Sequence, residues 1–318
     1  MKPVLLCLFH LADEHRLAIG EHFEMIHAET PQARADAFAS RGPDIQAVLT
    51  NGTLGLTAAE MDTMPRLSLA AAMGAGYEGV DVDHAMQRGV VVTHGPGTND
   101  DCVADHAMAM LLSAVRRLRQ LDLACRQGVW RSELPLPPNV SGKKLGIVGL
   151  GTIGRKIAKR GAAFDLDIGY HNRSPRAEVP YRYFDSAASL AAWCDFLVVI
   201  TPGGAATRHL IDAKVLAALG PQGFLVNVGR GTVVDTAALV EALKAGRLGG
   251  VALDVYEGEP SPPTSLFEFE NVTLTPHMAG WSPEAVTASV HLFVANARRH
   301  FAGEPVLTPV PELSRAAG

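Results

Sequence analysis

The sequence predicts an α/β protein of two domains, each built on a parallel sheet flanked by helices. Three observations support this fold class. Short apolar runs alternate with polar or helical segments along most of the chain. A length of 318 residues exceeds that of an ordinary single domain. A glycine-rich turn, Gly149–Gly154, follows an apolar run near the middle of the chain, where a strand would lead into a helix.

In the first part of the chain, strands are predicted by runs rich in β-branched and aliphatic residues. These runs are Val4–Phe9, Ile45–Thr50, Leu67–Ala71 and Val90–Thr93. The segments between them, such as Glu21–Ser40 and Ala58–Met64, are polar or helical. This alternation is what crossover connections between parallel strands require.

The second half repeats the same rhythm. The predicted strands are Leu145–Gly149, Asp167–His171, Phe196–Ile200, Gly223–Val228, Gly250–Asp254 and Val272–Thr275. Between the two halves, Asp101–Val115 has few polar interruptions, and a helix that is apolar all round must be buried on several sides. A last helical pattern, Pro283–Phe301, is well placed to return to the first domain.

Composition excludes several classes of partner. The net charge of -5 and the absence of a basic block give no electrostatic reason to bind nucleic acid or an acidic membrane. No apolar run approaches the length of a membrane span, and the run at Val4–Phe9 is too short for a signal peptide. The four cysteines lack metal-ligand spacing, so we expect reduced thiols, no metal site and a cytoplasmic location.

The glycine-rich turn has the pattern Gly149-x-Gly151-x-x-Gly154. Gly149 would allow the turn, Gly151 would let a phosphate approach the backbone, and Gly154 would let the helix pack closely on the strand. The backbone N–H groups at such a helix start suit the pyrophosphate of a dinucleotide. The same pattern alone also fits any tight turn from a strand to a helix, so its meaning depends on the rest of the chain.

The rest of the chain resembles the D-isomer-specific 2-hydroxyacid dehydrogenases, and within them the glyoxylate and hydroxypyruvate reductases. The motifs that carry the resemblance lie in order between Leu67 and Trp281. They are Gly74-Ala-Gly-Tyr-Glu-Gly-Val-Asp81, Gly95-Pro-Gly-Thr-Asn, Val103-Ala-Asp-His106, the glycine-rich turn, Val226-Asn-Val-Gly-Arg-Gly231, Leu253-Asp-Val-Tyr-Glu-Gly-Glu-Pro260 and Thr275-Pro-His-Met-Ala-Gly280. A chance match to all of them in this order is implausible.

The resemblance implies two Rossmann-like domains, with a cofactor domain inserted into a flavodoxin-like substrate domain. The expected boundaries are 1–98 plus 286–318 for the substrate domain and 99–285 for the NAD(P)-binding domain. An active-site cleft between the domains is implied as well. So is a homodimer joined largely through the helix region 101–116.

Reduction of a 2-keto acid needs a cation for the carboxylate, a proton donor for the carbonyl oxygen and a hydride donor. Arg230 and His277 each follow a predicted strand, and a guanidinium can hold a carboxylate with two hydrogen bonds. Histidine can donate a proton near neutral pH. By resemblance, Glu259 is the acid that orients His277, with Glu257 as the competing acid of the same loop. His106 matches a family motif too, and we interpret it as structural.

The cofactor-binding residues that we predict follow the glycine-rich turn and later strand ends. They are Gly149, Gly151, Thr152, Ile153, Gly154, Asn172, Arg173, Ser174, Thr201, Pro202, Val228 and Asp254. By resemblance, Asp254 would bond the nicotinamide side; a turn cap is the alternative. Asn172 stands where NAD-selective folds place an acid, and with Arg173 and Ser174 it favours NADP(H), although NAD(H) is possible. The alternative is that Arg173 and Arg176 are only solvated charges.

The expected function is reduction of a small 2-keto acid, glyoxylate or hydroxypyruvate, to the D-2-hydroxy acid by hydride transfer from NADPH, with His277 as proton donor. Leu54, Ala75 and Gly76 would line the substrate site together with Arg230 and His277. Two alternatives use the same fold: a dinucleotide-sensing regulator or co-repressor, and a dehydrogenase of another substrate such as phosphonate or formate. One departure from the family pattern is Asp165, where glycine is common, which predicts a changed turn.

Overall fold

The structure is a computed structural model that describes residues 2–316. These residues separate into two compact units. Unit 1 contains the described residues up to Asn99 and those from Trp281 onward, and unit 2 is Asp100–Gly280. The expected second domain boundary, at 285/286, falls inside the helix Pro283–Phe301, which belongs to unit 1 as a whole.

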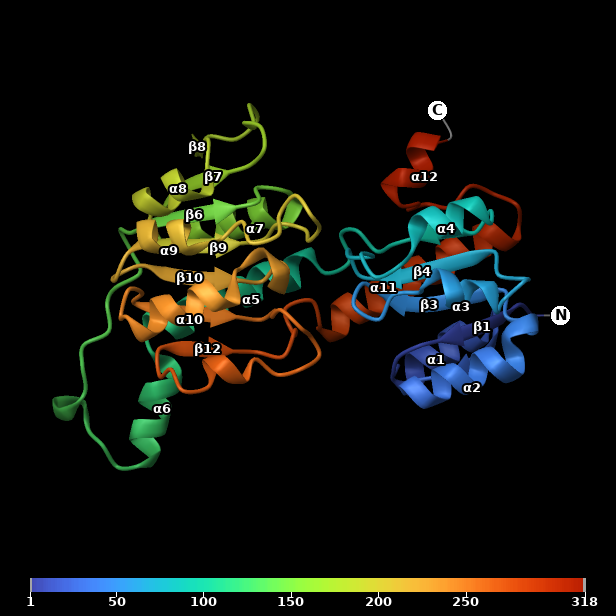
Figure 1. Cartoon of the computed structure of the whole chain (residues 1–318), viewed down its shortest axis with the longest axis horizontal. Coiled ribbons are helices and arrows are strands. Elements are labelled where there is room, and N and C mark those ends of the chain that lie inside the picture. Colours follow the sequence, from blue (N-terminus) through green and yellow to red (C-terminus); the bar gives the residue numbers. More distant parts are fainter. Residues whose placement is uncertain (1, 317–318) are drawn as a thin grey trace. The chain divides into compact units, whose positions relative to one another are not determined.

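Unit 1 is built on a five-stranded parallel sheet with the strand order β2-β1-β3-β4-β5 (Figure 1). The strands are β1 (Val4–Cys7), β2 (Glu24–His27), β3 (Ala47–Asn51), β4 (Leu69–Met73) and β5 (Val91–Thr93). This order is that of flavodoxin-like sheets. Its central strands are buried on both faces, as a sheet covered by helices on each side requires.

Two groups of helices cover the sheet of unit 1. The first face carries α1 (Asp13–Gly20) and α11 (Pro283–Phe301), which pack on alternate side chains such as Leu5, Cys7 and Leu49. The opposite face carries α2 (Pro31–Arg41), α3 (Ala58–Asp62) and α4 (Val82–Gln87), and α12 (Pro311–Ala316) ends the described chain. The helix predicted at Pro283–Phe301 therefore does return to the first part of the chain.

Unit 2 is built on a seven-stranded parallel sheet with the order β12-β11-β10-β9-β6-β7-β8. The strands are β6 (Lys144–Val148), β7 (Asp167–His171), β8 (Arg182–Phe184), β9 (Phe196–Val199), β10 (Phe224–Asn227), β11 (Gly250–Leu253) and β12 (Val272–Leu274). From β6 the chain first builds outward through β7 and β8, and then crosses back to β9 on the other side. The sheet thus has the reversal point typical of Rossmann folds.

Helices cover both faces of this sheet (Figure 1). On one face lie α5 (Asp100–Val115) and α7 (Thr152–Ala163), and on the other α8 (Ala187–Trp193), α9 (Ala213–Leu219) and α10 (Thr236–Lys244). As its composition predicts, α5 is buried on several sides, against α7 and strands β10 to β12. The predicted α/β class with two helix-flanked parallel sheets is confirmed.

Two edge strands were not predicted from the sequence. β2 lies inside Glu21–Ser40, and β8 lies between two predicted strands. Each pairs with a single neighbour, and their burial patterns are mostly intermediate or exposed. An edge strand with few buried residues needs no continuous apolar run, so the pattern that marks the central strands is absent.

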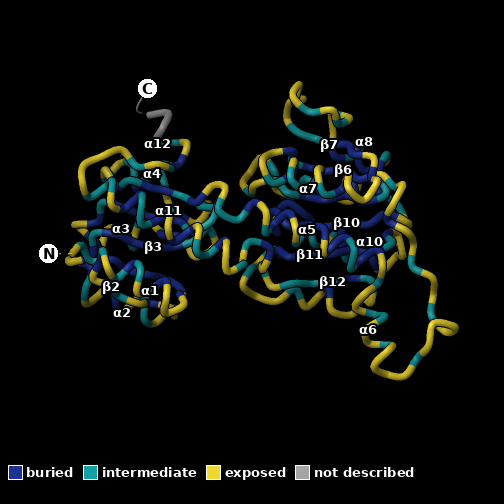
Figure 2. Tube along the Cα trace, turned by 180° about the vertical axis from the view of Figure 1, so that it is seen from behind, coloured by how far each residue is buried: buried dark blue, intermediate teal, exposed yellow. Residues whose placement is uncertain are grey.

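Helix α6 (Leu118–Arg126) and the segment that follows it extend away from the body of unit 2 and are largely exposed (Figure 2). Four large apolar side chains are exposed there: Leu118 (52%), Leu123 (46%), Trp130 (69%) and Leu136 (93%). Short 3-10 helices occur at Gly42–Asp44, Arg131–Glu133, Gly231–Val233 and Thr264–Leu266. Among residues 2–316, no helix is long and apolar enough to cross a membrane.

Candidate active site

The predicted site residues of unit 2 gather at one edge of its sheet. All strand pairs of this sheet are parallel, so the carboxyl ends of the strands share an edge. The segments that follow these ends carry Gly149 to Gly154 after β6, Asn172 after β7, Thr201 after β9, Val228 and Arg230 after β10, Asp254 after β11 and His277 after β12. Ligands of open α/β sheets bind at this edge, near the reversal point.

The three glycines of the turn have different steric surroundings. Gly149 has φ +104°, a backbone conformation that favours glycine, and a Cβ there would lie 2.8 Å from Ile200 O. A Cβ on Gly154 would lie 2.2 Å from Gly149 O, so the first turn of α7 packs directly against the loop. A Cβ on Gly151 would meet no atom within 4 Å. Gly151 therefore borders open space, where a ligand can approach the backbone.

Two observations fit a dinucleotide at this turn. Gly151 is the N-cap of α7, and no side chain caps the helix, so the N–H groups of the first turn, at Thr152 and Ile153, have no side-chain acceptor. Next to the turn, Thr201 Oγ1 is buried without a hydrogen-bond partner in the described structure. A ligand with phosphate and hydroxyl groups supplies acceptors and donors for such atoms.

Asn172 is tied to the glycine-rich turn. Its Oδ1 accepts a hydrogen bond of 2.7 Å from the Leu150 N–H, which fixes the end of β7 beside the turn. Arg173 and Ser174 follow it and are exposed, as is Arg176. The position expected to bind the ribose of the dinucleotide therefore holds an uncharged amide, and two arginines follow it.

Arg230 is held by the turn that follows β10. Asn227 is fully buried, and its Nδ2 donates to Arg230 O at 3.0 Å, while its Oδ1 accepts from Gly229 N–H at 3.1 Å. The Arg230 guanidinium donates from Nη1 to Gly229 O at 2.8 Å. Asn227 thus fixes the backbone on both sides of the arginine.

His277 and Glu259 are in direct contact. Nδ1 of His277 lies 2.6 Å from Oε2 of Glu259, and because a carboxylate can only accept, Nδ1 carries the proton. The other carboxylate oxygen, Oε1, accepts from Tyr256 N–H at 2.6 Å. Nε2 of His277 has no hydrogen-bond partner in the part of the chain that the structure describes, and the side chain is 36% exposed. Nε2 is therefore the ring atom that can exchange a proton with a ligand.

Glu257, the competing acid of the loop, points elsewhere. Its Oε1 lies 2.8 Å from His209 Nε2, and its Oε2 accepts from Thr236 N–H at 3.1 Å. Between the two acids, Gly258 takes φ +82° and turns the chain. The structure therefore brings Glu259, and not Glu257, to His277.

Asp254 is completely buried and caps the turn that carries His277. Its carboxylate accepts from Thr275 Oγ1 (2.6 Å), Met278 N–H (2.7 Å) and Ala279 N–H (2.8 Å), and its backbone oxygen accepts from His277 N–H (2.8 Å). Burial alone would raise the pKa of Asp254, but hydrogen bonds from His106, Thr275 and the turn outweigh it and lower that pKa.

These contacts hold His277 in an uncommon backbone conformation. Its φ is +55°, which costs free energy in any residue but glycine and persists only where neighbours enforce it. His106 reaches the same turn from α5, because its Nε2 lies 3.1 Å from Thr275 Oγ1. The turn-cap interpretation of Asp254 thus has direct geometric support, and a bond to the nicotinamide stays a prediction.

The remaining predicted residues, Leu54, Ala75 and Gly76, lie in unit 1, on loops that follow β3 and β4. The two loops touch through glycines, because a Cβ on Gly52 would lie 2.8 Å from the Gly76 carbonyl. Ala75 O accepts a hydrogen bond from His94 Nδ1 at 3.0 Å. The N–H groups of Ala75 and Gly76 have no acceptor within residues 2–316. They are available to bind an anion.

Two residues of the site were given no role from the sequence, Asn227 and Tyr256. Tyr256 OH donates toward Leu253 O (3.0 Å) and Thr275 O (2.5 Å), which joins the ends of β11 and β12. In the sequence, Asn227 is a single amide at the end of an otherwise apolar run, within the motif Val226–Gly231. No cluster of metal-ligating side chains occurs among the residues described, and all four cysteines are free thiols.

Comparisons with known proteins show which family the chain belongs to. Residues 108–279 match the family model of the D-isomer-specific 2-hydroxyacid dehydrogenase, NAD-binding domain. The chain is 40% identical to a hydroxyphenylpyruvate reductase of Plectranthus scutellarioides and 38% identical to glyoxylate/hydroxypyruvate reductase A of Arabidopsis thaliana. Each match covers 92% of this chain and 94% of the relative.

A solved structure is equally similar. The NADPH-dependent glyoxylate/hydroxypyruvate reductase from Sinorhizobium meliloti, in complex with NADP and malonate, is 40% identical with a TM-score of 0.90, and 98% of each chain is covered. The resemblance inferred from the motifs is confirmed. The chain therefore belongs to the D-isomer-specific 2-hydroxyacid dehydrogenases and is an NAD(P)-dependent oxidoreductase.

Proposed function

We propose that this protein reduces a small 2-keto acid, glyoxylate or hydroxypyruvate, to the D-2-hydroxy acid, with NADPH as the hydride donor and His277 as the proton donor. The observation that carries the proposal is the 2.6 Å contact between His277 Nδ1 and Glu259 Oε2, on the same sheet edge as Arg230 and the glycine-rich turn. Relatives named for glyoxylate and hydroxypyruvate reduction support this substrate class.

Each residue has a chemical role in this proposal. The guanidinium of Arg230 binds the substrate carboxylate with paired hydrogen bonds and polarises the adjacent carbonyl. In unit 1, Leu54, Ala75 and Gly76 are the residues proposed for the substrate, and the backbone N–H groups of Ala75 and Gly76 can bind an anion. His277 donates the Nε2 proton to the carbonyl oxygen as charge develops there, and Glu259 stabilises the imidazolium and keeps Nδ1 protonated. Bound NADPH supplies the hydride to the carbonyl carbon.

The test is a panel of 2-keto acids assayed with NADPH and, in parallel, with NADH. We expect oxidation of NADPH with glyoxylate and hydroxypyruvate to give the highest kcat/KM. If neither NADPH nor NADH is oxidised with any of these acids, the proposal is wrong. Binding of NADPH without any turnover would then favour a dinucleotide-sensing regulator on the same fold.

The preference for NADPH follows from Asn172, Arg173 and Ser174, which offer hydrogen bonds and positive charge to a 2′-phosphate. Asn172→Asp keeps the acceptor for Leu150 N–H but places a carboxylate beside that phosphate. Because like charges in contact cost several kcal/mol, we expect the ratio of kcat/KM for NADPH over NADH to fall by at least about tenfold. Asn139→Asp, an exposed site before β6, is the matched control. A wild type that prefers NADH would overturn the assignment.

We also propose a homodimer and a role for each unit. The apolar side chains of α5 are largely used inside unit 2, so we place the interface on its continuation, α6 and the segment up to Leu136, where four large apolar residues are exposed. Such a surface favours a second copy of the chain. Sedimentation should give twice the chain mass, and Trp130→Asp with Leu136→Asp should give monomers. A wild-type monomer would contradict the proposed homodimer.

We propose that unit 2 binds the dinucleotide and that unit 1 binds the substrate.

A further inference from the structure

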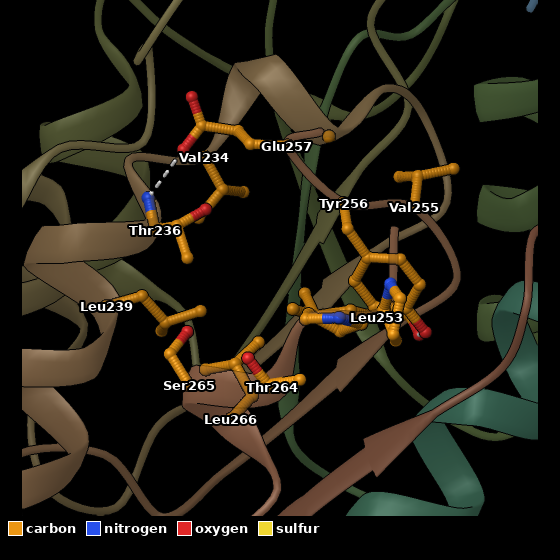
Figure 3. A pocket seen from close by; sticks show the side chains of 13 residues that line it. Val234, Thr236, Leu239, Leu253, Val255, Tyr256, Glu257, Thr264, Ser265 and Leu266 are labelled. Carbon is orange, nitrogen blue, oxygen red and sulfur yellow. Dashed lines mark hydrogen bonds between the residues drawn. The ribbon is translucent and has the colours of Figure 1, made fainter. Parts of the chain in front are cut away.

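The loop that carries Glu259 has a second anchor. Glu257 uses both carboxylate oxygens, one for His209 Nε2 (2.8 Å) and one for Thr236 N–H at the start of α10 (3.1 Å; Figure 3). Burial alone would raise the pKa of Glu257, but the bonds from Thr236 and His209 outweigh it and lower that pKa. Glu257 is therefore a charged, doubly bonded side chain with no contact to His277.

This anchor lies above a cavity. The space has a volume of about 210 Å³ and is lined below the loop by Leu239, Leu253 and Leu266, and above by Tyr256 and Glu257 (Figure 3). It is several times the volume of about 30 Å³ that one water occupies. Side chains therefore do not fill the space beside Glu257, and its two hydrogen bonds are polar contacts at the rim of that space.

The loop that carries Glu257 contacts the residue after Arg230 and also holds Glu259 against His277. A Cβ on Gly231 would lie 2.0 Å from the Tyr256 carbonyl, so the residue after Arg230 rests directly on the loop. On the other side, Tyr256 N–H holds Oε1 of Glu259, whose Oε2 contacts His277. Glu257 is adjacent to Tyr256 in the chain, so movement at Glu257 moves both contacts.

His209 is fixed to the same region by its backbone. His209 N–H donates to Thr232 O at 2.9 Å, two residues after Arg230, and Asp235 N–H donates to Ile211 O at 3.1 Å. Nδ1 of His209 lies 3.7 Å from Asp235 Oδ2, and Nε2 faces Glu257, so a carboxylate lies next to each ring nitrogen. Arg208 approaches Glu257 at 3.8 Å but is more than half exposed.

We propose that His209 and Glu257 are positioning residues: their contact fixes the loop over the cavity so that Glu259 meets His277 in the geometry required for proton donation. The proposal rests on the proposed function, because it assigns a purpose to the pair His277 and Glu259. In the proposed reaction, neither His209 nor Glu257 touches the reacting atoms. Misplacement of a catalytic group by about 1 Å can cost about 10²-fold in rate, so a partial loss of position has a measurable effect.

The experiment compares Glu257→Ala, Glu257→Gln and His209→Ala in the full-length protein. We expect Glu257→Ala to lower kcat about 10- to 30-fold with KM for NADPH unchanged, a loss below that of full misplacement. Glu257→Gln keeps an acceptor oxygen and should recover most of kcat. In a His277→Ala background, Glu257→Ala should cost less than twofold more, because the pair it positions is gone. Equal losses in both backgrounds would overturn the proposal.

The matched control is Asp62→Ala. It removes a carboxylate from an imidazole contact of the same 2.8 Å length, with His84 in unit 1, and should leave kcat unchanged. A readout that needs no turnover separates this inference from the proposed function. The Nδ1–H proton resonance of His277, identified by its absence in His277→Ala, should be present in wild type and broadened or lost in Glu257→Ala. An unchanged resonance would overturn the inference even in an active enzyme, whereas wild-type inactivity with every 2-keto acid would contradict only the proposed function.

Discussion

Replacing His277 with alanine is expected to lower kcat for 2-keto acid reduction by about 10²- to 10⁴-fold, the range that a general acid contributes. The dissociation constant for NADPH should not change, because the residues that fit the dinucleotide surround the glycine-rich turn and belong to other strand ends. Steady-state kinetics together with equilibrium titration of NADPH measure the two effects separately. The expected result is an enzyme that binds its cofactor and barely turns over.

The control for this variant is His291→Ala. His291 is exposed on α11, and no hydrogen bond or ion pair within residues 2–316 joins it to the site, so both kcat and NADPH binding should match wild type. Retention of more than about a tenth of wild-type kcat by His277→Ala would remove His277 as the general acid, given the usual size of such contributions. A lost NADPH affinity would instead show that the turn held by Asp254 had collapsed.

The central strands were predictable because burial on both faces leaves a strong mark in the sequence. All strands inside the two sheets coincide, to within a few residues, with the apolar runs. The edge strands β2 and β8 leave no such mark, because few of their side chains are buried. Only the Rossmann-like and flavodoxin-like domain types were implied, through the family resemblance, since periodicity carries no information on which strands are neighbours.

Within the site, the residue types were predictable and their orientations were not. Glu257 and Glu259 are two residues apart, and spacing alone could not decide which one faces His277. The decision comes from Gly258 at φ +82° and from Thr236 N–H and His209, which bind Glu257 on the far side of the turn. Those partners lie about 20 and 50 residues away, beyond the reach of any local pattern.

The local geometry of Asp165 and Asp254 has a physical account only in the structure. Asp165, where the family often has glycine, was expected to change its turn; it takes φ +58°, the left-handed region that glycine prefers and aspartate tolerates. For Asp254 the sequence left two interpretations, a bond to the nicotinamide and a turn cap; its carboxylate is fully buried and bonded to the turn of His277, which supports the cap, and the bond to the nicotinamide stays a prediction. A buried acid and a ligand-binding acid at a strand end have the same sequence signature.

Arg230→Lys is the second prediction with a large effect, and its loss should fall on the substrate. We expect kcat/KM for the 2-keto acid to fall by about 10- to 10²-fold, mainly through KM, because a hydrogen bond to a charged group contributes about 1.5–3 kcal/mol and lysine cannot form the paired geometry. KM for NADPH should stay close to the wild-type value.

Lysine keeps the positive charge, so the variant separates geometry from electrostatics. Asn227 fixes the backbone on both sides of Arg230 and does not depend on the side chain at that position, so the turn should remain in place. Arg298→Lys, on the exposed side of α11, makes the same exchange outside the site and should leave KM unchanged. If Arg230→Lys also leaves KM and kcat unchanged, the carboxylate is bound elsewhere, and the N–H groups of Ala75 and Gly76 become the remaining candidates. A loss confined to kcat would instead assign Arg230 to polarising the carbonyl, with little share in binding the carboxylate.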